Sequence, residues 1–160
     1  GWAMKNTTAP KDPKIVIITF QVGGVESYRY DVEIPRKFGI DQTVGDTLGP
    51  GGVFRFLRSV PAYEQIAKDA AELCPEALFL NYANPMAMAT SYLNLLGLPT
   101  VGLCHSVQGT TRMLARAIDV PHEEVNYLSA GINHQSFILR FQRGNEDLFE
   151  AHADTLPQFD

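Results

Sequence analysis

The chain has 160 residues and a formal net charge of −5, with 13 lysines and arginines against 18 aspartates and glutamates. This length suits one domain with a buried core, and the acidic balance argues against nucleic acids and anionic membranes as partners. No apolar run is long enough to span a bilayer, and we expect no targeting segment. Two separate cysteines indicate a reducing, cytoplasmic location instead of a disulfide framework.

The first stretch, residues 1–13, is polar and punctuated by prolines, which is typical of a flexible leader. Residues 14–20 form a run rich in isoleucine and valine that predicts a buried strand. Gly23 and Gly24 follow this strand. Paired glycines allow the backbone to approach a ligand closely, so we expect a binding loop here.

A helix interrupted near Pro35 is expected over residues 28–38, followed by a long, polar, glycine-rich connection over residues 39–52. A connection of this length inside a compact domain is usually functional or disordered. Two short helices, residues 53–60 and 62–73, are predicted to meet at Pro61, because proline disturbs a helix interior.

Two strand–loop–helix units come next. In the first, residues 76–80 form a strand and Asn84 caps a helix over residues 86–96. In the second, residues 100–103 form a strand and Ser106 caps the following helix. In an open α/β sheet ligands bind at the carboxyl ends of the strands, so these loops are the predicted site.

The last part of the chain contains two further strand-like runs, residues 125–131 and 136–141. A polar tail over residues 143–160 includes a short helix near residues 146–153. The pattern as a whole predicts an α/β domain over residues 14–142, with a mostly parallel sheet and flanking helices.

Cys104 and His134 offer a thiolate and an imidazole, a combination that suits a divalent transition metal. Two ligands thirty residues apart are a weak metal signature, so a small buried cysteine and a hydrogen-bonded core histidine are the alternative. A third interpretation makes His105 the base that activates Cys104 as a nucleophile. Spacing by itself leaves these interpretations open.

Four blocks carry a resemblance: residues 39–52, 84–86, 102–109 and 130–134. In this order and spacing they resemble the signature blocks of glycoside hydrolase family 4. The first block is similar to the α-galactosidase (melibiase) branch of that family. The resemblance extends over residues 15–141, which is most of the chain.

The resemblance implies a partial Rossmann-like (dehydrogenase-like) fold and a glycosidase that needs NAD⁺, a divalent metal such as Mn²⁺, and reducing conditions. In the mechanism it implies, the sugar is oxidised at C3 and a base removes the C2 proton. Elimination at C1 then expels the aglycone, water adds, and the hydride returns. The expected substrate is a small-molecule α-galactoside.

The resemblance makes Cys104 and His134 the metal ligands. It gives His105 a catalytic position, where it hydrogen-bonds the sugar or orients the metal shell. Asp46 corresponds to an acidic position near the substrate, with a simple turn aspartate as the alternative. The pattern around Asp46 favours a plain galactoside over a 6-phospho-glycoside.

Further residues carry binding roles by the same resemblance. Asn84 is expected to contact sugar hydroxyls and to lie near the nicotinamide, while Asn133 and His105 support the sugar. Gly23 and Gly24 are the expected cofactor-binding glycines.

Family members also carry a glycine-rich NAD motif and a C-terminal catalytic region that this sequence does not show. We therefore interpret it as a truncated or naturally short relative, without the usual route to tight NAD⁺ binding. The alternatives are a non-catalytic metal-binding or sugar-binding remnant, a 6-phospho-glycosidase, and a dehydrogenase-like binding module. Exposed apolar surface predicts a homo-oligomer.

Overall fold

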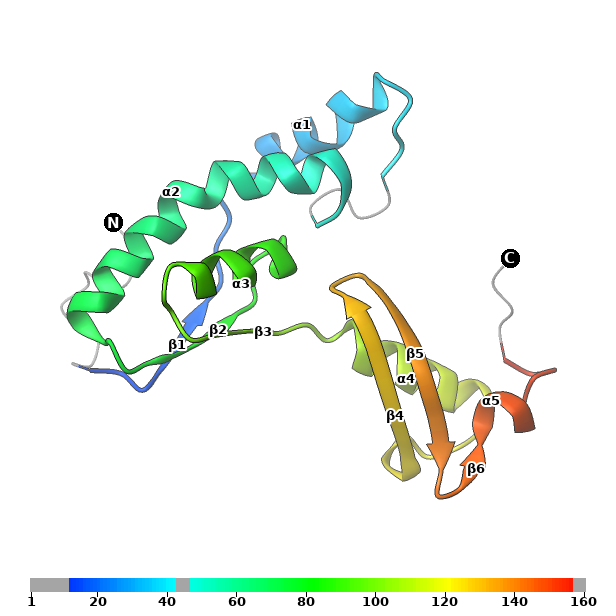
Figure 1. Ribbon diagram of the computed structural model, residues 1–160. Helices are drawn as coiled ribbons and strands as arrows, with labels where there is room; N and C mark the ends of the chain where they lie inside the picture. The colour runs from blue at the N-terminus through cyan, green and yellow to red at the C-terminus, as the bar shows by residue number, and fades with distance from the viewer. Residues whose placement is uncertain (1–11, 43–46, 157–160) are drawn as a thin grey trace. The chain divides into compact units, whose positions relative to one another are not determined.

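The computed structural model describes residues 12–42 and 47–156, and Figure 1 traces the chain through them. The predicted leader therefore falls almost wholly outside the described residues, and Asp46 falls outside them as well. The chain forms two compact units, one up to Leu103 and the other from Cys104 onward. Each unit is described in turn.

The first unit is built on a parallel sheet of β1 (Ile15–Ile18), β2 (Leu78–Asn81) and β3 (Thr100–Gly102), in that spatial order. The register places Ile18 opposite Asn81 and Asn81 opposite Gly102, so the three strands end at one edge. This arrangement confirms the predicted α/β class.

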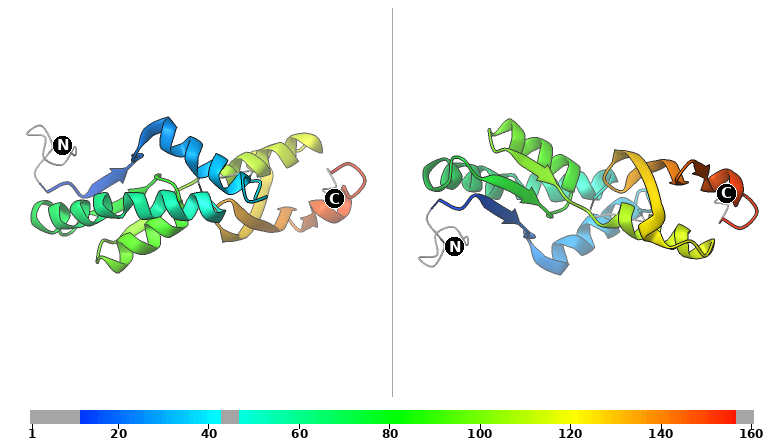
Figure 2. Two further views of the ribbon diagram at one scale, coloured as in Figure 1. Left: turned by 90° about the horizontal axis from the view of Figure 1, so that it is seen from above. Right: turned by 90° about the horizontal axis from the view of Figure 1, so that it is seen from below.

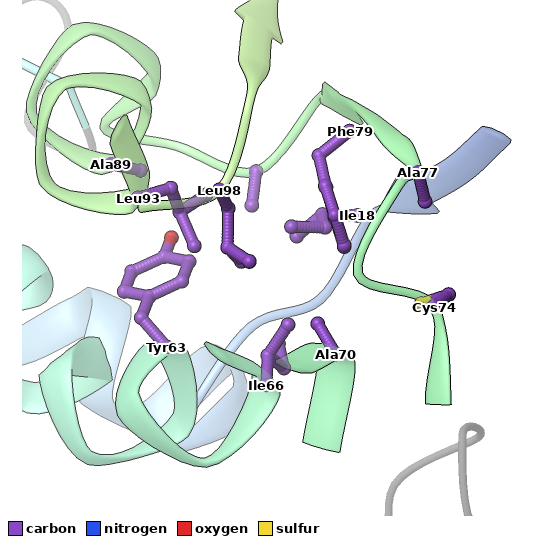
Figure 3. Close-up of a cluster of buried hydrophobic side chains, with 11 residues drawn as sticks. Ile18, Tyr63, Ile66, Ala70, Cys74, Ala77, Phe79, Ala89, Leu93 and Leu98 are labelled. Carbon is purple, nitrogen blue, oxygen red and sulfur yellow. The ribbon is translucent and has the colours of Figure 1, made fainter. Parts of the chain in front are cut away.

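Two helices of the first unit, α2 (Gly49–Leu73) and α3 (Met86–Leu95), lie on the same face of this sheet (Figures 1 and 2). Figure 3 shows Tyr63 from α2 and Leu93 from α3 pointing into one cluster with Phe79 of β2. All three side chains are almost fully buried. Burial of a side chain of this size stabilises a fold by about 1.5–3 kcal/mol, so this cluster holds the helices on the sheet.

The opposite face of the sheet carries the alternate side chains. Ile15 and Ile17 are 59% and 60% exposed, and Val101 is 46% exposed. Because successive side chains of a strand point to opposite faces, these residues form an apolar layer without a covering helix among the described residues.

Helix α2 differs from the prediction. The structure has one helix from Gly49 to Leu73 with Pro61 inside it, so the predicted break at Pro61 and the predicted connection over residues 49–52 are both wrong. The buried face of the helix continues across the proline through Ser59 and Tyr63. Phe56 before Pro61 and Tyr63 after it both pack in or against the core cluster, and this packing offsets the cost of about 3 kcal/mol that proline brings to a helix interior.

Helix α1 (Gly24–Arg36) begins four residues before the predicted start, and it includes Pro35 in its last turn instead of being interrupted there. The predicted helix caps are also displaced. Pro85, not Asn84, is the N-cap of α3, and His105, not Ser106, is the N-cap of α4 (Ser106–Ala117). Ser106 does not cap because its backbone N–H and its hydroxyl both contact the Cys104 sulfur instead.

The second unit packs α4 against an antiparallel sheet of β4 (Val125–Ile132), β5 (Gln135–Arg143) and the short β6 (Glu146–Asp147), which leads into α5 (Leu148–Ala151). A short 3₁₀ helix (His122–Glu124) precedes β4. The core of this unit is formed by Leu114, Ala115, Ile118, Val120, Val125, Phe141 and Leu148.

The predicted strands over residues 125–131 and 136–141 are present, and they pair as a hairpin. The predicted helix over residues 146–153 is shorter, because Glu146 and Asp147 pair with β5 and the Asp147 side chain caps α5. Among the helices in the described ranges, none has the length and apolar character needed to cross a membrane.

Candidate metal centre

Asn133 and His134 form the two-residue turn of the β4–β5 hairpin, between the paired residues Ile132 and Gln135. His134 has a φ of 63°, a left-handed conformation that is uncommon for a residue with a side chain. Gly131 has a φ of 139°, and a Cβ atom there would lie 2.5 Å from the Ser136 Cα. The position of the imidazole therefore depends on a turn that a glycine makes possible.

The hairpin turn brings the imidazole to the thiol that precedes α4. The Cys104 Sγ and the His134 Nε2 are 3.6 Å apart. Donor atoms roughly 2.1 and 2.3 Å from one tetrahedral ion lie about 3.6 Å from each other. The separation therefore fits two ligands of a single cation.

Hydrogen bonds favour the ionised form of the thiol. Partial burial on its own raises the pKa of Cys104, but hydrogen bonds from the Ser106 side chain and backbone, the Asn133 side chain and the His105 backbone outweigh it. Together they hold the pKa of Cys104 below its ordinary value of 9.0. The sulfur also lies at the N-terminal end of α4, where the helix dipole stabilises a thiolate. A thiolate is the form that binds metals.

Two buried polar atoms beside the thiol have no hydrogen-bond partner among the described residues, Asn133 Oδ1 and His134 Nδ1. Unpaired polar atoms in a buried position are costly, and they cluster at functional sites. A histidine that ligates a metal usually donates its second ring N–H to an acceptor. The His134 Nδ1 is the atom that would make this second contact.

The described ranges hold no group of three or more histidine, cysteine, aspartate or glutamate side chains arranged for a metal. Cys104 and His134 would thus form a two-residue ligand set, which would leave coordination positions for oxygens from water or a substrate. His105 is exposed at the start of α4, next to the pair. Asp46 lies outside the described residues, so its role stays a prediction.

The other predicted site residues lie in the first unit, at the carboxyl edge of its sheet. Gly23 is the N-cap of α1 and has a φ of 88°, and Gly24 begins the helix with a φ of 62°. A Cβ atom on Gly23 would overlap the Ser27 side chain, so the backbone of this loop depends on glycine. Asn84 follows β2 and precedes a cis peptide bond to Pro85.

Two residues that support Asn84 escaped the sequence prediction. Asn81 is fully buried and fixes the loop that follows β2. Its side-chain amide N–H donates to the Ala83 carbonyl, and its amide oxygen accepts from the Ala83 N–H at 3.0 Å. Arg55 is buried on α2 and its Nε donates to the Asn84 carbonyl at 3.2 Å. The position of Asn81 at the end of an apolar strand could have identified it as a residue that supports the loop. No local sequence feature could have identified Arg55.

The fold and the thiol–imidazole pair define a Rossmann-like α/β protein with a candidate metal centre. Comparison with known proteins then gives the family, because the model of the family 4 glycosyl hydrolases matches residues 2–120. The chain belongs to this family, as the four sequence blocks predicted.

Two curated relatives come from Bacillus subtilis. An α-galactosidase is 46% identical over 136 residues, covering 84% of this chain and 32% of the relative. An α-galacturonidase is 39% identical over 156 residues, covering 91% of this chain and 33% of the relative. The chain thus spans about a third of the length of these relatives.

A solved relative has a closely similar fold. The 6-phospho-β-glucosidase of Thermotoga maritima, determined with manganese, NAD⁺ and glucose-6-phosphate, has a TM-score of 0.76 and 30% sequence identity. The match covers 88% of this chain and 34% of that structure. The similarity confirms the predicted Rossmann-like sheet.

Proposed function

We propose that this chain carries the metal-binding part of an NAD- and metal-dependent glycosidase that acts on α-galactosides. The observation that carries the proposal is the 3.6 Å approach of the Cys104 sulfur to the His134 imidazole. The α-galactosidase relative, at 46% identity, supports the choice of substrate over the galacturonide and 6-phospho-glucoside alternatives.

In the proposed site Cys104 and His134 hold a divalent cation. A bound cation supplies Lewis-acid stabilisation of negative charge on sugar oxygens. The donors to the Cys104 sulfur keep it ionised and therefore ready to bind. A thiolate and an imidazole also suit softer ions than Mn²⁺, so metal identity is a matter for direct titration.

Around this pair, His105 and Asn133 supply hydrogen bonds to the sugar. Asp46 remains the proposed acidic group near the substrate. The NAD⁺ contacts are assigned to the Gly23–Gly24 loop and to Asn84, whose carbonyl is fixed by Arg55. A bound nicotinamide supplies reversible hydride transfer. The location we propose remains cytoplasmic.

The first test measures metal binding by itself. Cobalt(II) titrated into the reduced chain should give thiolate-to-metal charge-transfer absorption. Cys104→Ser should abolish this absorption, and His134→Ala should weaken cobalt binding. Cys74→Ala is the matched control, because Cys74 is the other free thiol and lies in the core of the first unit. Equal absorption in wild type and Cys104→Ser would refute the metal centre.

The second test measures turnover. A chromogenic α-galactoside should be hydrolysed only with Mn²⁺, NAD⁺ and reductant together, and the matching α-galacturonide and 6-phospho-glucoside should react more slowly. Cobalt binding without any hydrolysis would instead support the alternative of a non-catalytic binding remnant. Hydrolysis that survives loss of both Cys104 and His134 would refute the mechanism.

A further inference from the structure

Arg58 of α2 contacts two separate parts of the first unit. Its guanidinium donates two hydrogen bonds to the Asp31 carboxylate of α1, at 3.1 and 2.5 Å. Its Nε donates to the Val22 carbonyl at 3.2 Å, in the loop between β1 and α1. This one side chain therefore joins α2 both to α1 and to the loop that leads into Gly23 and Gly24.

The carboxylate that accepts these hydrogen bonds is buried and held in place. The Asp31 side chain is 4% exposed, and that of Arg58 is 26% exposed. The Asp31 backbone carbonyl accepts from the Gln42 side chain at 2.9 Å, and the same side chain accepts from the Gly51 N–H at 3.0 Å. Bidentate hydrogen bonds to a carboxylate fix the plane of a guanidinium. Asp31 therefore sets the direction in which the Arg58 Nε points toward Val22.

Two carbonyl groups of the loop over residues 21–24 accept hydrogen bonds from side chains. The Val22 carbonyl accepts from Arg58, and the Gly24 carbonyl accepts from the Gln21 side chain at 2.9 Å. Gln21 belongs to the loop itself, so its hydrogen bond shapes the loop without attaching it to the helices. The Arg58 contact is the one that attaches the loop to α2.

The two glycines of this loop face different surroundings. A Cβ atom on Gly23 would lie 3.3 Å from the Arg58 Nε, so a glycine lets the guanidinium come close to the backbone. A Cβ atom on Gly24 would meet nothing within 4 Å. The loop is thus supported by Arg58 beside Gly23 and open to a ligand beside Gly24.

We propose that Arg58 is a positioning residue for NAD⁺ binding, because it holds the Gly23–Gly24 loop in the conformation that receives the cofactor. This inference rests on the proposed function, which assigns NAD⁺ contacts to that loop. A loop that is already fixed loses less conformational freedom when its ligand binds, so the affinity is higher. Freedom regained by the backbone of one residue corresponds to a loss of affinity of about tenfold.

Two variants of the ion pair separate positioning from stability. Arg58→Lys keeps a positive charge opposite Asp31 but lacks the separate Nε donor that reaches Val22. We expect it to weaken NAD⁺ binding about tenfold with a small change in melting temperature. Asp31→Asn removes the charge pair and keeps the Nε donor. It should show the larger loss of melting temperature, because Arg58 loses its charged partner, and the smaller loss of affinity.

Isothermal titration of NAD⁺ into the full chain measures the affinity, and amide hydrogen exchange over residues 21–28 measures how firmly the loop and the first turn of α1 are held. Exchange in this segment should be faster in Arg58→Lys than in the wild type, with or without NAD⁺. Arg36→Lys is the matched control. Arg36 also pairs with a carboxylate, that of Asp41 at 3.0 Å, but this exposed pair lies at the other end of α1, so both measurements should stay unchanged.

Equal NAD⁺ affinity in Arg58→Lys and the wild type would overturn the inference and leave the proposed function standing. A loss of affinity that follows the loss of melting temperature in both variants would also contradict it, because the ion pair would then act through stability alone. No NAD⁺ binding by the wild type would refute the cofactor contacts of the proposed function, and this inference with them.

Discussion

Replacement of Gly131 by alanine tests whether the hairpin geometry controls the metal centre. Gly131 precedes the turn by two residues and has a φ of 139°, and a new Cβ atom would lie 2.5 Å from both the Gln135 carbonyl oxygen and the Ser136 Cα. A strained backbone costs about 1–3 kcal/mol and a close contact in a packed site costs a similar amount. We therefore expect Gly131→Ala to destabilise the hairpin turn by about 3 kcal/mol.

The turn relieves this strain by moving, and His134 moves with it. If about 2 kcal/mol of the strain returns when a cation draws the imidazole back to Cys104, cobalt binding weakens about thirtyfold. Thermal unfolding measures the loss of stability, and cobalt titration measures the loss of affinity.

Gly144→Ala is the matched control for this prediction. Gly144 lies in the β5–β6 turn with a φ of 60°, and a Cβ atom there meets nothing within 4 Å. Alanine should cost about 1 kcal/mol at this position and leave cobalt affinity unchanged. Unchanged affinity in Gly131→Ala, or an equal loss in both variants, would refute the link between the turn and the metal.

Three further changes probe the thiol, the loop and the core. Ser106→Ala removes the hydroxyl donor to the Cys104 sulfur and keeps the backbone N–H donor, so the pKa of Cys104 rises and its alkylation by iodoacetamide at neutral pH slows; an unchanged pH–rate profile would contradict this. Because the folded pKa lies below 9.0, the ionised thiol adds stability above the unfolded pKa that is lost as the pH falls through the folded one. Asn81→Ala leaves two Ala83 backbone groups unpaired, and urea unfolding should show a loss of about 2–4 kcal/mol. Leu93→Ala opens a cavity in the first core and should cost about 2–5 kcal/mol; a loss below 1 kcal/mol would mean that the cluster of Figure 3 is loosely packed.

The parallel strands could be predicted because each is a short apolar run followed by polar or glycine residues. The continuity of α2 could not be predicted, since it depends on packing of Tyr63 and Ile66 on a sheet whose strands come from distant parts of the sequence. Local sequence preferences predict a break in the helix at Pro61. Tertiary packing overrides that local preference.

The sequence pointed to Cys104 and His134 as a pair through the family blocks, not through their spacing, and their role as metal ligands stays a prediction. Cys104 and His134 are 30 positions apart in the sequence, with α4 and β4 between them, and only the hairpin turn brings the two side chains together. The supporting contact of Arg55 to Asn84 joins residues 29 positions apart. No local pattern encodes a contact over that distance.

The two proposed ligands also have a mechanical consequence for the second unit. A cation bound by both Cys104 and His134 would close a loop of about thirty residues. Closing this loop lowers the conformational entropy of the unfolded chain, which would stabilise the folded state by about 3.5 kcal/mol. The cation would then cross-link the start of α4 to the turn of the β4–β5 hairpin. Chelation should lower the melting temperature of the wild type and leave that of Cys104→Ser unchanged.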